Sequence, residues 1–314
     1  MKKIIIDTDP GIDDAYAIFF ALCHPHIDVL ALTSVHGNVE VDLAAENALR
    51  LAELAGHDIP VAQGALRPRN GNKAPSPQDI HGKNGLGDVS VPDFKGRLLD
   101  EHAAATIVRL VRAHPGEVTL VPIGPLTNIA LALDLAPDLE EKVAGVTLMG
   151  GAAQVAGNIT PAAEANIFHD PHAADRVFSA KWPIVMAGLD ATMQVTFSAA
   201  QIDQIAETAP HLGGWLRKFS GLYVDFYKRA RGLNGVVPHD LLAVMAITHP
   251  EIFSTRTGRI RIACEGPAAG ATVFWPSEKL TRDAVWEATP ERTILTGVSS
   301  DKVFSIFTDT LKGR

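Results

Sequence analysis

Cysteine is scarce in this sequence, with only Cys23 and Cys264 among 314 residues. Each lies among apolar neighbours, so we expect two buried thiols in a reducing compartment and no disulfide. Two cysteines are also too few for a zinc site built from cysteine alone. The cysteine content therefore argues against both a redox function and a zinc–cysteine function.

Long hydrophobic runs are missing as well. The apolar run before the first aspartate is only Ile4-Ile5-Ile6. This run is too short for the apolar region of a secretory signal. No apolar stretch approaches the ~20 residues that a membrane span needs. We therefore expect a cytoplasmic protein without a membrane segment.

Positive charge is in deficit, since 28 Lys and Arg residues stand against 36 Asp and Glu residues, for a net charge of −8. With no basic tract, this balance argues against nucleic acid as a partner. Aromatic residues make up only 6% of the chain, but hydrophobic residues make up 46%, so the chain can bury a large core.

Strand and helix patterns alternate along the first 190 residues. We predict strands at 3–6, Ile27–Ser34, 60–63, Val118–Pro122, 143–149 and Ile184–Ala187, with helices between them, including Val41–Leu54. Alternation of this kind predicts an α/β fold with an open, mostly parallel, Rossmann-like sheet covered by helices on both faces. The absence of a linker, a repeat or a low-complexity tract favours a single domain over residues 1–314. After Ser198 the pattern changes to long helices, followed by short strands near 259–263 and 271–274.

One long segment, residues 64–98, is rich in Gly, Pro, Asn and Lys. An irregular segment of that length is more often functional than idle. We therefore treat it as a candidate lid.

Four carboxylates follow the first predicted strand, at Asp7, Asp9, Asp13 and Asp14. Like charges this close repel, so a divalent cation with oxygen ligands is the economical explanation. Asp13 and Asp14 could instead cap the next helix, but capping does not explain the other two. An EF-hand loop is excluded because Ile12 stands where that loop needs glycine.

The predicted strand ends carry further polar groups. In open parallel sheets ligands bind beyond the carboxyl ends of the strands, where Asp9, Asn38, Ile123 and Gly150 fall. The spacing of Asp7 and Asp9 also fits an aspartate-nucleophile phosphatase, although the following Pro10-Gly11 and second Asp pair do not.

A series of motifs resembles the inosine-uridine-preferring nucleoside hydrolase family, in order and in spacing, over nearly the whole chain. The matching segments are Asp7 to Ala15, Gly37-Asn38, His81-Gly82, Val121 to Asn128, Met149-Gly150-Gly151, Gly157-Asn158, Glu164-Ala165-Asn166, Asp170-Pro171 and His239-Asp240. One such motif is weak evidence, but the ordered series is highly specific.

The resemblance implies a calcium-dependent hydrolysis of the N-glycosidic bond of ribonucleosides. Its calcium ligands would be Asp9, Asp14, the backbone carbonyl of Ile123 and Asp240, an oxygen-only set of the kind that Ca²⁺ prefers. Asp9 would act as general base on a metal-bound water. The resemblance also implies a homodimer or a homotetramer.

The resemblance further implies which residues hold the substrate. Those expected to bind it are Asp13, Asn38, His81, Met149, Asn158, Glu164, Asn166 and Tyr227. His239 matches the family histidine proposed as the acid for the leaving base, and an unperturbed histidine pKa of ~6.5 suits that role. Tyr223 and Tyr227 are four residues apart on a predicted helix, so they share one face, which is equally typical of core residues.

Three questions stay open at this stage. A phosphatase acting on nucleotides and a non-catalytic nucleoside-binding protein are alternatives from other functional classes. The preference between purine and pyrimidine is also open, because Ala165 and Phe274-Trp275 are unusual where relatives differ around the base.

Overall fold

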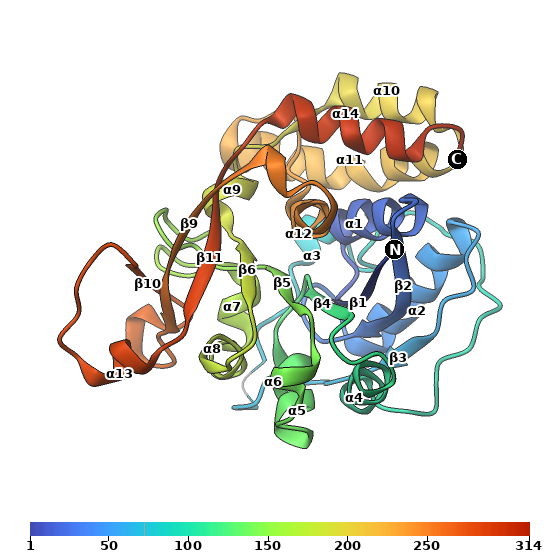
Figure 1. The fold of residues 1–314 in the computed structure, drawn as a ribbon. Helices are drawn as coiled ribbons and strands as arrows, with labels where there is room; N and C mark the ends of the chain where they lie inside the picture. Colours follow the sequence, from blue (N-terminus) through green and yellow to red (C-terminus); the bar gives the residue numbers. More distant parts are fainter. Residues whose placement is uncertain (72) are drawn as a thin grey trace.

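The computed structural model describes residues 1–71 and 73–314, and this part of the chain contains one nine-stranded sheet in the order β10-β9-β11-β6-β5-β4-β1-β2-β3 (Figure 1). Every neighbouring pair from β11 to β3 is parallel, whereas β9 is antiparallel to both β11 and β10. The strands are β1 Lys2–Thr8, β2 Ile27–Ser34, β3 Val61–Gln63, β4 Val118–Pro122, β5 Gly145–Met149, β6 Ile184–Ala187, β9 Phe253–Ile262, β10 Thr272–Pro276 and β11 Glu291–Val298, while β7 Phe197–Ser198 and β8 Gly235–Val236 form a small separate ribbon.

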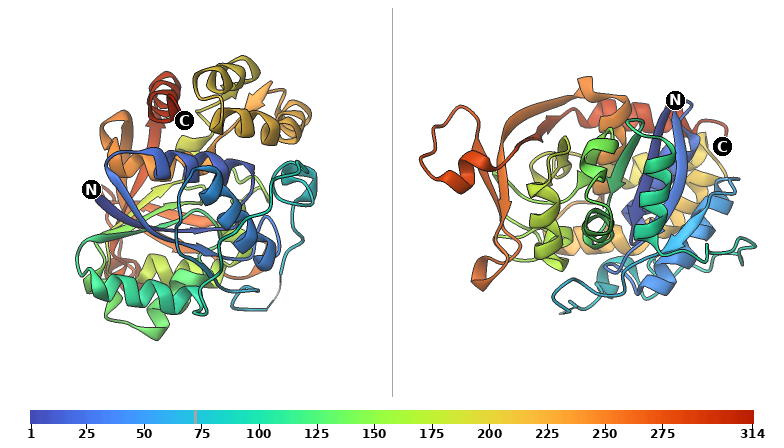
Figure 2. Two further views of the ribbon diagram at one scale, coloured as in Figure 1. Left: turned by 90° about the vertical axis from the view of Figure 1, so that its right-hand side faces the viewer. Right: turned by 60° about the horizontal axis from the view of Figure 1, so that its bottom comes forward.

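Helices cover both faces of the large sheet (Figures 1 and 2). On one face lie α1 Ile12–Cys23, α2 Val41–Leu54, α11 Leu212–Arg231, α12 His239–Thr248 and α14 Ser300–Leu311, and on the other lie α4 Ala103–Ala113, α5 Thr127–Leu135 and α8 Pro171–Ser179. The shorter or outer helices are α3 Gln78–His81, α6 Leu139–Lys142, α7 Ala165–His169, α9 Leu189–Thr192, α10 Ala199–Thr208 and α13 Ala284–Ala288. The predicted two-faced, mostly parallel α/β fold in one domain is confirmed.

The two faces bury separate hydrophobic cores, and the central strand β1 contributes to both. Ile4 and Ile6 pack into the core under α1 and α12, whereas Ile5 packs into the core with α4 and α5. This alternation follows from the two-residue period of a strand. Because β1 is buried on both sides, the residues that follow it begin deep inside the molecule.

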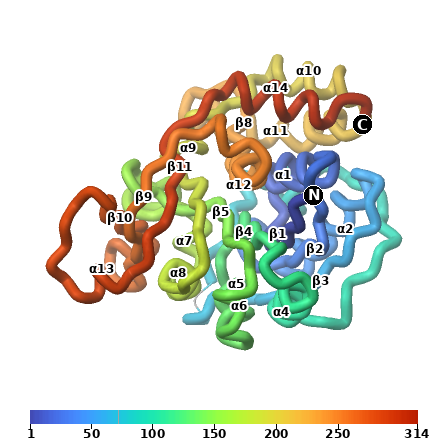
Figure 3. Tube along the Cα trace, in the orientation of Figure 1, coloured from blue at the N-terminus to red at the C-terminus, as the bar shows by residue number. Residues whose placement is uncertain are grey.

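The chain reverses its direction of winding next to β1. From β1 it proceeds to β2 and β3 on one side, and then crosses to β4 on the other side, as the trace in Figure 3 shows. The loops after β1 and β4 therefore diverge to opposite faces and leave a crevice at the carboxyl ends of the strands. This switch point is where the fold places a ligand.

The sequence prediction missed strand β11, which lies between β6 and β9 in the sheet. Its register against β9 shifts between Leu295 and Gly297, so its residues do not alternate regularly between apolar and polar. The predicted short strand at 259–263 is in fact the end of β9, which begins at Phe253. Both differences arise because pairing with distant strands outweighs the local pattern.

The described residues of the segment 64–98 are irregular, as predicted, apart from the short helix α3 and a bridge between Val61 and Leu98. Asn72 belongs to this predicted lid but lies outside the described residues. Among the described residues, every helix is too short or too polar to cross a membrane.

Candidate active site

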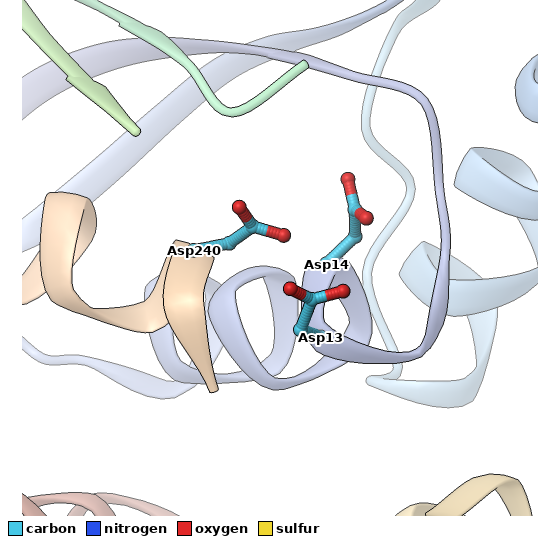
Figure 4. A group of neighbouring side chains, drawn as sticks. All are labelled: Asp13, Asp14 and Asp240. Atoms are coloured by element: carbon cyan, nitrogen blue, oxygen red, sulfur yellow. The ribbon is translucent and has the colours of Figure 1, made fainter. Parts of the chain in front are cut away.

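Two helix N-termini bring carboxylates together at the switch point. Asp13 and Asp14 occupy the first turn of α1, and Asp240 occupies the first turn of α12. In Figure 4 the side chain of Asp240 extends toward those of Asp13 and Asp14, and one oxygen of each lies within 4.8 Å of the others. Both helix dipoles favour negative charge at this point, which partly offsets the repulsion among the three carboxylates.

Asp14 is fixed in place by its neighbours. Its Oδ2 accepts a hydrogen bond from the backbone N–H of Gly11 at 2.8 Å, and its Oδ1 accepts one from the Thr8 hydroxyl. The Asn38 side chain also donates to Asp14 Oδ2, at 3.3 Å. The carboxylate is therefore held by groups on β1, on the following turn and on the loop after β2.

Asp9 is held in a narrow slot between two glycines. Its Oδ2 accepts from the backbone N–H of Asn38 at 2.7 Å. A Cβ atom on Gly37 would lie 1.9 Å from Oδ2, and one on Gly124 would lie 2.5 Å from Oδ1. Only glycine fits at these two positions, which explains the Gly37-Asn38 and Ile123-Gly124 motifs.

Two carboxylate oxygens in this cluster are buried and lack a partner among the described residues, namely Asp9 Oδ1 and Asp13 Oδ1. Burial raises the pKa of Asp9 and of Asp240 well above the usual range of an aspartate, and it raises the pKa of Asp13 to about 8. Repulsion by the neighbouring carboxylates adds to each of these shifts. An oxygen-only set with unpartnered oxygens and mutual repulsion fits a hard divalent cation.

One cavity joins the cluster to the rest of the predicted site. Every predicted site residue lines it except Asp9 and Asp14, which are fully buried beside Asn38. The predicted residues that line the cavity are Asp13, Asn38, His81, Ile123, Met149, Asn158, Glu164, Asn166, Tyr227, His239 and Asp240.

Glu164 organises one wall of this cavity. Its carboxylate caps α7 by accepting the backbone N–H groups of Asn166 and Ile167, at 2.9 and 3.1 Å. It also accepts the N–H of Gly151 at 2.9 Å, where φ is +88°, a value that favours glycine. The Glu164 carboxylate thus links α7 to the loop after β5. This link explains why the Met149-Gly150-Gly151 and Glu164-Ala165-Asn166 motifs occur together.

Asn166 ties two strand ends together. Its Nδ2 donates to the Ile123 carbonyl at 3.0 Å and to the Met149 carbonyl at 3.3 Å. A carbonyl oxygen has two lone pairs, so Ile123 can accept this bond and still offer a lone pair to a cation. Asn158 is exposed at the mouth of the cavity, and its side-chain oxygen accepts from the N–H of Ala165 at 3.0 Å.

The opposite end of the cavity is aromatic. The Tyr227 hydroxyl lies 2.7 Å from His239 Nε2, and the rings of Tyr223 and Tyr227 lie 4.9 Å apart on one face of α11. Burial, reinforced by the charge of Arg231, lowers the pKa of His239 to about 4, so this imidazole is neutral at pH 7. Both of its ring nitrogens have partners, because Nδ1 lies 2.7 Å from Thr192 Oγ1.

His81 connects the candidate lid to the carboxylates. Its Nδ1 accepts the backbone N–H of Ile12 at 3.1 Å and lies 3.9 Å from Asp13 Oδ1. Its ring packs against Tyr223, with the centroids 5.3 Å apart. Burial lowers the pKa of His81 to about 3, so it too is a neutral group at pH 7.

A family profile described as inosine-uridine preferring nucleoside hydrolase matches residues 4–305. The chain belongs to this family. Members of the nucleoside hydrolase family are glycosidases that act on N-glycosyl compounds, and this chain is such an enzyme.

Individual relatives agree with the family assignment. The chain is 40% identical over 313 residues to a probable uridine nucleosidase 2 of Arabidopsis thaliana, covering 99% of this chain and 97% of that protein. It is 38% identical over 296 residues to an inosine-uridine preferring nucleoside hydrolase of Leishmania major, covering 90% and 92%. A solved plant nucleoside hydrolase superposes with a TM-score of 0.96 at 37% identity, covering 100% of this chain and 99% of that structure.

Sequence reasoning missed several residues of this nucleoside hydrolase site. Thr192 and Thr8 bond to His239 and Asp14, while Met193, Ile159 and Phe226 line the aromatic end of the cavity. Thr192 follows the end of β6, so the rule that ligand groups lie beyond strand ends could have found it. The apolar residues show no signal in the sequence that separates them from ordinary core residues.

Proposed function

We propose that this protein hydrolyses the N-glycosidic bond of ribonucleosides, with calcium, to give ribose and a free base. The observation that carries the proposal is a single cavity with buried, unpartnered carboxylate oxygens at one end and a tyrosine–histidine pair at the other. The first end suits a sugar hydroxyl pair and a developing positive charge, and the second suits a departing base.

The residues present fit a calcium ion. Asp9, Asp14, Asp240 and the Ile123 carbonyl would hold it, and Asp13 would face the sugar. Asp9 and Asp14 are fully buried behind the surface of the cavity, whereas Asp13 lines it together with Asp240 and Ile123, so the assignment of Asp13 to the sugar follows the family resemblance. A bound Ca²⁺ would supply positive charge that keeps these carboxylates ionised and attracts the sugar hydroxyls.

Asp9 is the group that we assign as general base for the attacking water. Its Oδ2 is fixed by the Asn38 N–H, which leaves Oδ1 as the atom free to take a proton. The glycine slot prevents the carboxylate from rotating away. A base held in one orientation can take a proton from a water molecule as that water attacks the anomeric carbon.

The ribose is oriented by polar side chains around the carboxylate end. These are Asp13, Asn38, Glu164 and Asn166, with Asn158 at the mouth of the cavity. Because Glu164 and Asn166 are themselves fixed by backbone groups, they offer hydroxyl partners without losing freedom on binding. A sugar without its 2′-hydroxyl is therefore expected to react poorly.

We assign the protonation of the leaving base to the pair of Tyr227 and His239. His239 has both ring nitrogens engaged, so it reaches a substrate only through the Tyr227 hydroxyl. This refines the expectation that His239 alone supplies the proton.

The relatives favour this function over the two alternatives. Family membership argues against a phosphatase. A non-catalytic binding protein would not need a buried Asp9 Oδ1 that has no hydrogen-bond partner among the described residues. The relatives are named for uridine and for inosine with uridine, so we propose both nucleosides as substrates in nucleoside catabolism. A cytoplasmic homodimer or homotetramer remains our expectation.

A panel of ribonucleosides assayed for ribose release tests the proposal. We expect release from uridine and inosine, loss of release after removal of divalent ions, and recovery on adding Ca²⁺. Phosphate release from nucleotides without ribose release from any nucleoside would overturn it. Full activity in a protein that metal analysis shows to be free of divalent ions would overturn the calcium assignment alone.

A further inference from the structure

A buried threonine lies behind the leaving-group pair. Thr192 is the last residue of α9, just after β6, and its side chain is fully buried. Its Oγ1 lies 2.7 Å from His239 Nδ1. The backbone N–H of Leu189, at the start of α9, donates to the Gly151 carbonyl at 2.8 Å, so α9 is anchored to the loop that Glu164 also holds.

The direction of the Thr192 hydrogen bond follows from its surroundings. Other threonines on helices of this chain, such as Thr208 and Thr308, donate to a backbone carbonyl four residues earlier. Within the described chain, Thr192 Oγ1 has His239 Nδ1 as its side-chain hydrogen-bond partner and makes no such backbone bond. A buried hydroxyl proton needs an acceptor, so Thr192 donates to Nδ1.

That direction fixes the rest of the chain of hydrogen bonds. An imidazole whose Nδ1 accepts a hydrogen bond carries its proton on Nε2, and this N–H then donates to the Tyr227 oxygen at 2.7 Å. The Tyr227 hydroxyl proton is then left for a group in the cavity. In the other tautomer, His239 carries its proton on Nδ1. Tyr227 would then donate its hydroxyl proton to Nε2, and the Thr192 hydroxyl proton would have no acceptor.

We propose that Thr192 is a positioning residue that holds His239 in the Nε2–H tautomer, so that Tyr227 directs its own proton at the leaving base. This inference rests on the proposed function. When the C–N bond breaks, the base nitrogen keeps the electron pair and takes the Tyr227 proton. The Nε2–H of His239 stabilises the resulting phenolate, and the proton that Asp9 takes from water restores Tyr227 through the solvent.

The test compares Thr192→Val, which keeps the shape and removes the donor, with Thr192→Ser, which keeps the donor. We expect Thr192→Val to lower kcat on uridine and inosine by roughly 10- to 100-fold with little change in KM. Turnover of a nitrophenyl riboside, whose leaving group needs no proton, should be retained. Thr192→Ser should recover most of the lost turnover. Thr196→Val, at a half-buried threonine in the same connection, is the matched control.

Equal losses on both kinds of substrate, or no recovery in Thr192→Ser, would overturn the inference. A second measurement does not depend on turnover. In ¹⁵N-histidine-labelled protein, with His239→Gln used for assignment, the His239 signal should show a protonated Nε2 and an unprotonated Nδ1 in the native enzyme. A protonated Nδ1 would overturn the inference even if ribose release is normal. Failure of the native protein to release ribose would instead contradict the proposed function.

Discussion

The two ends of the cavity are built in different ways. The carboxylate end is made from strand ends and helix N-termini, where Asp9, Asp14 and Glu164 each accept a hydrogen bond from a backbone N–H and two glycines confine Asp9. The aromatic end is made from one face of α11, the candidate lid and the loop at 152–163, with half-buried or exposed apolar residues such as Phe226 and Ile159.

This difference separates the reaction from its selectivity. A group that the central sheet holds on several sides cannot shift without disturbing the fold. The carboxylate end therefore determines which bond is hydrolysed. Side chains on a helix surface and on loops can change with little structural cost. We therefore expect substitutions at the carboxylate end to abolish turnover, and substitutions of the apolar residues at the aromatic end to redistribute it among bases.

The largest expected effect is that of Asp9→Asn. The amide keeps the size of the side chain but cannot take a proton from water, so we expect kcat to fall by ~10²–10⁴-fold on every nucleoside. Ribose release under saturating calcium measures this loss, and thermal unfolding checks that the fold is kept.

Asp79→Asn is the matched control for this substitution, since Asp79 is an exposed aspartate of α3 that does not line the cavity. It should leave turnover unchanged. Near-native turnover in Asp9→Asn would place the base elsewhere in the cluster and would weaken the contrast between the two ends.

The second effect concerns His239→Ala and Tyr227→Phe, which break the proton-donating pair at the aromatic end. We expect each to lower turnover of uridine and inosine by roughly 100-fold, because the base then departs without a proton. A nitrophenyl riboside should react at close to the native rate. If both kinds of substrate slow equally, His239 instead supports the neighbouring Asp240, and the aromatic end does not act on the leaving group alone.

The carboxylate end was more predictable from the sequence than the aromatic end. The motif from Asp7 to Asp14 follows a strand with an unmistakable pattern, and the motif series predicted that distant Asp240 would join it. Thr192 was not predicted, although it follows the end of β6, because its partner His239 is 47 residues away and a threonine carries no charge signal. The register shift that disguises β11 is likewise set by pairing with distant strands. Contacts of this kind depend on three-dimensional packing that no local pattern encodes.

The third effect is on stability in the absence of metal. Burial raises the pKa of Asp7 to about 7 and that of Asp13 to about 8, so both carboxyls bind protons more tightly in the folded than in the unfolded chain. The stabilisation that these two carboxyl groups add to the folded state is full below pH ~4 and is lost as pH rises through 7 to 8. His81 and His239, with lowered pKa values, act in the opposite sense, but only below pH ~6.5.

Thermal unfolding of chelated protein should therefore show a melting temperature that falls between pH 6.5 and 8.5. Added Ca²⁺ should raise the melting temperature most at the upper end of this range, because the ion favours the ionised carboxylates. A melting temperature that rises with pH in the chelated protein would contradict the raised pKa values of Asp7 and Asp13.

The smallest expected effect is that of Ile159→Ala at the mouth of the cavity. Ile159 lines the cavity but is 48% exposed, and it lies next to Asn158 rather than among the fixed carboxylates. Removing its side chain takes away apolar contact with the base, which in a pocket of this kind changes discrimination by about 1–3 kcal/mol at most. We expect KM to rise several-fold, more for one base than for the other, while kcat and calcium affinity stay constant.

Val155→Ala is the matched control, because Val155 has the same exposure in the same loop but does not line the cavity. The measurement is the ratio of kcat/KM for inosine to that for uridine in each variant. An unchanged ratio in Ile159→Ala, or a fall in kcat for both nucleosides, would show that this wall helps to hold the sugar, and the division between a fixed and a tunable end would have to be redrawn.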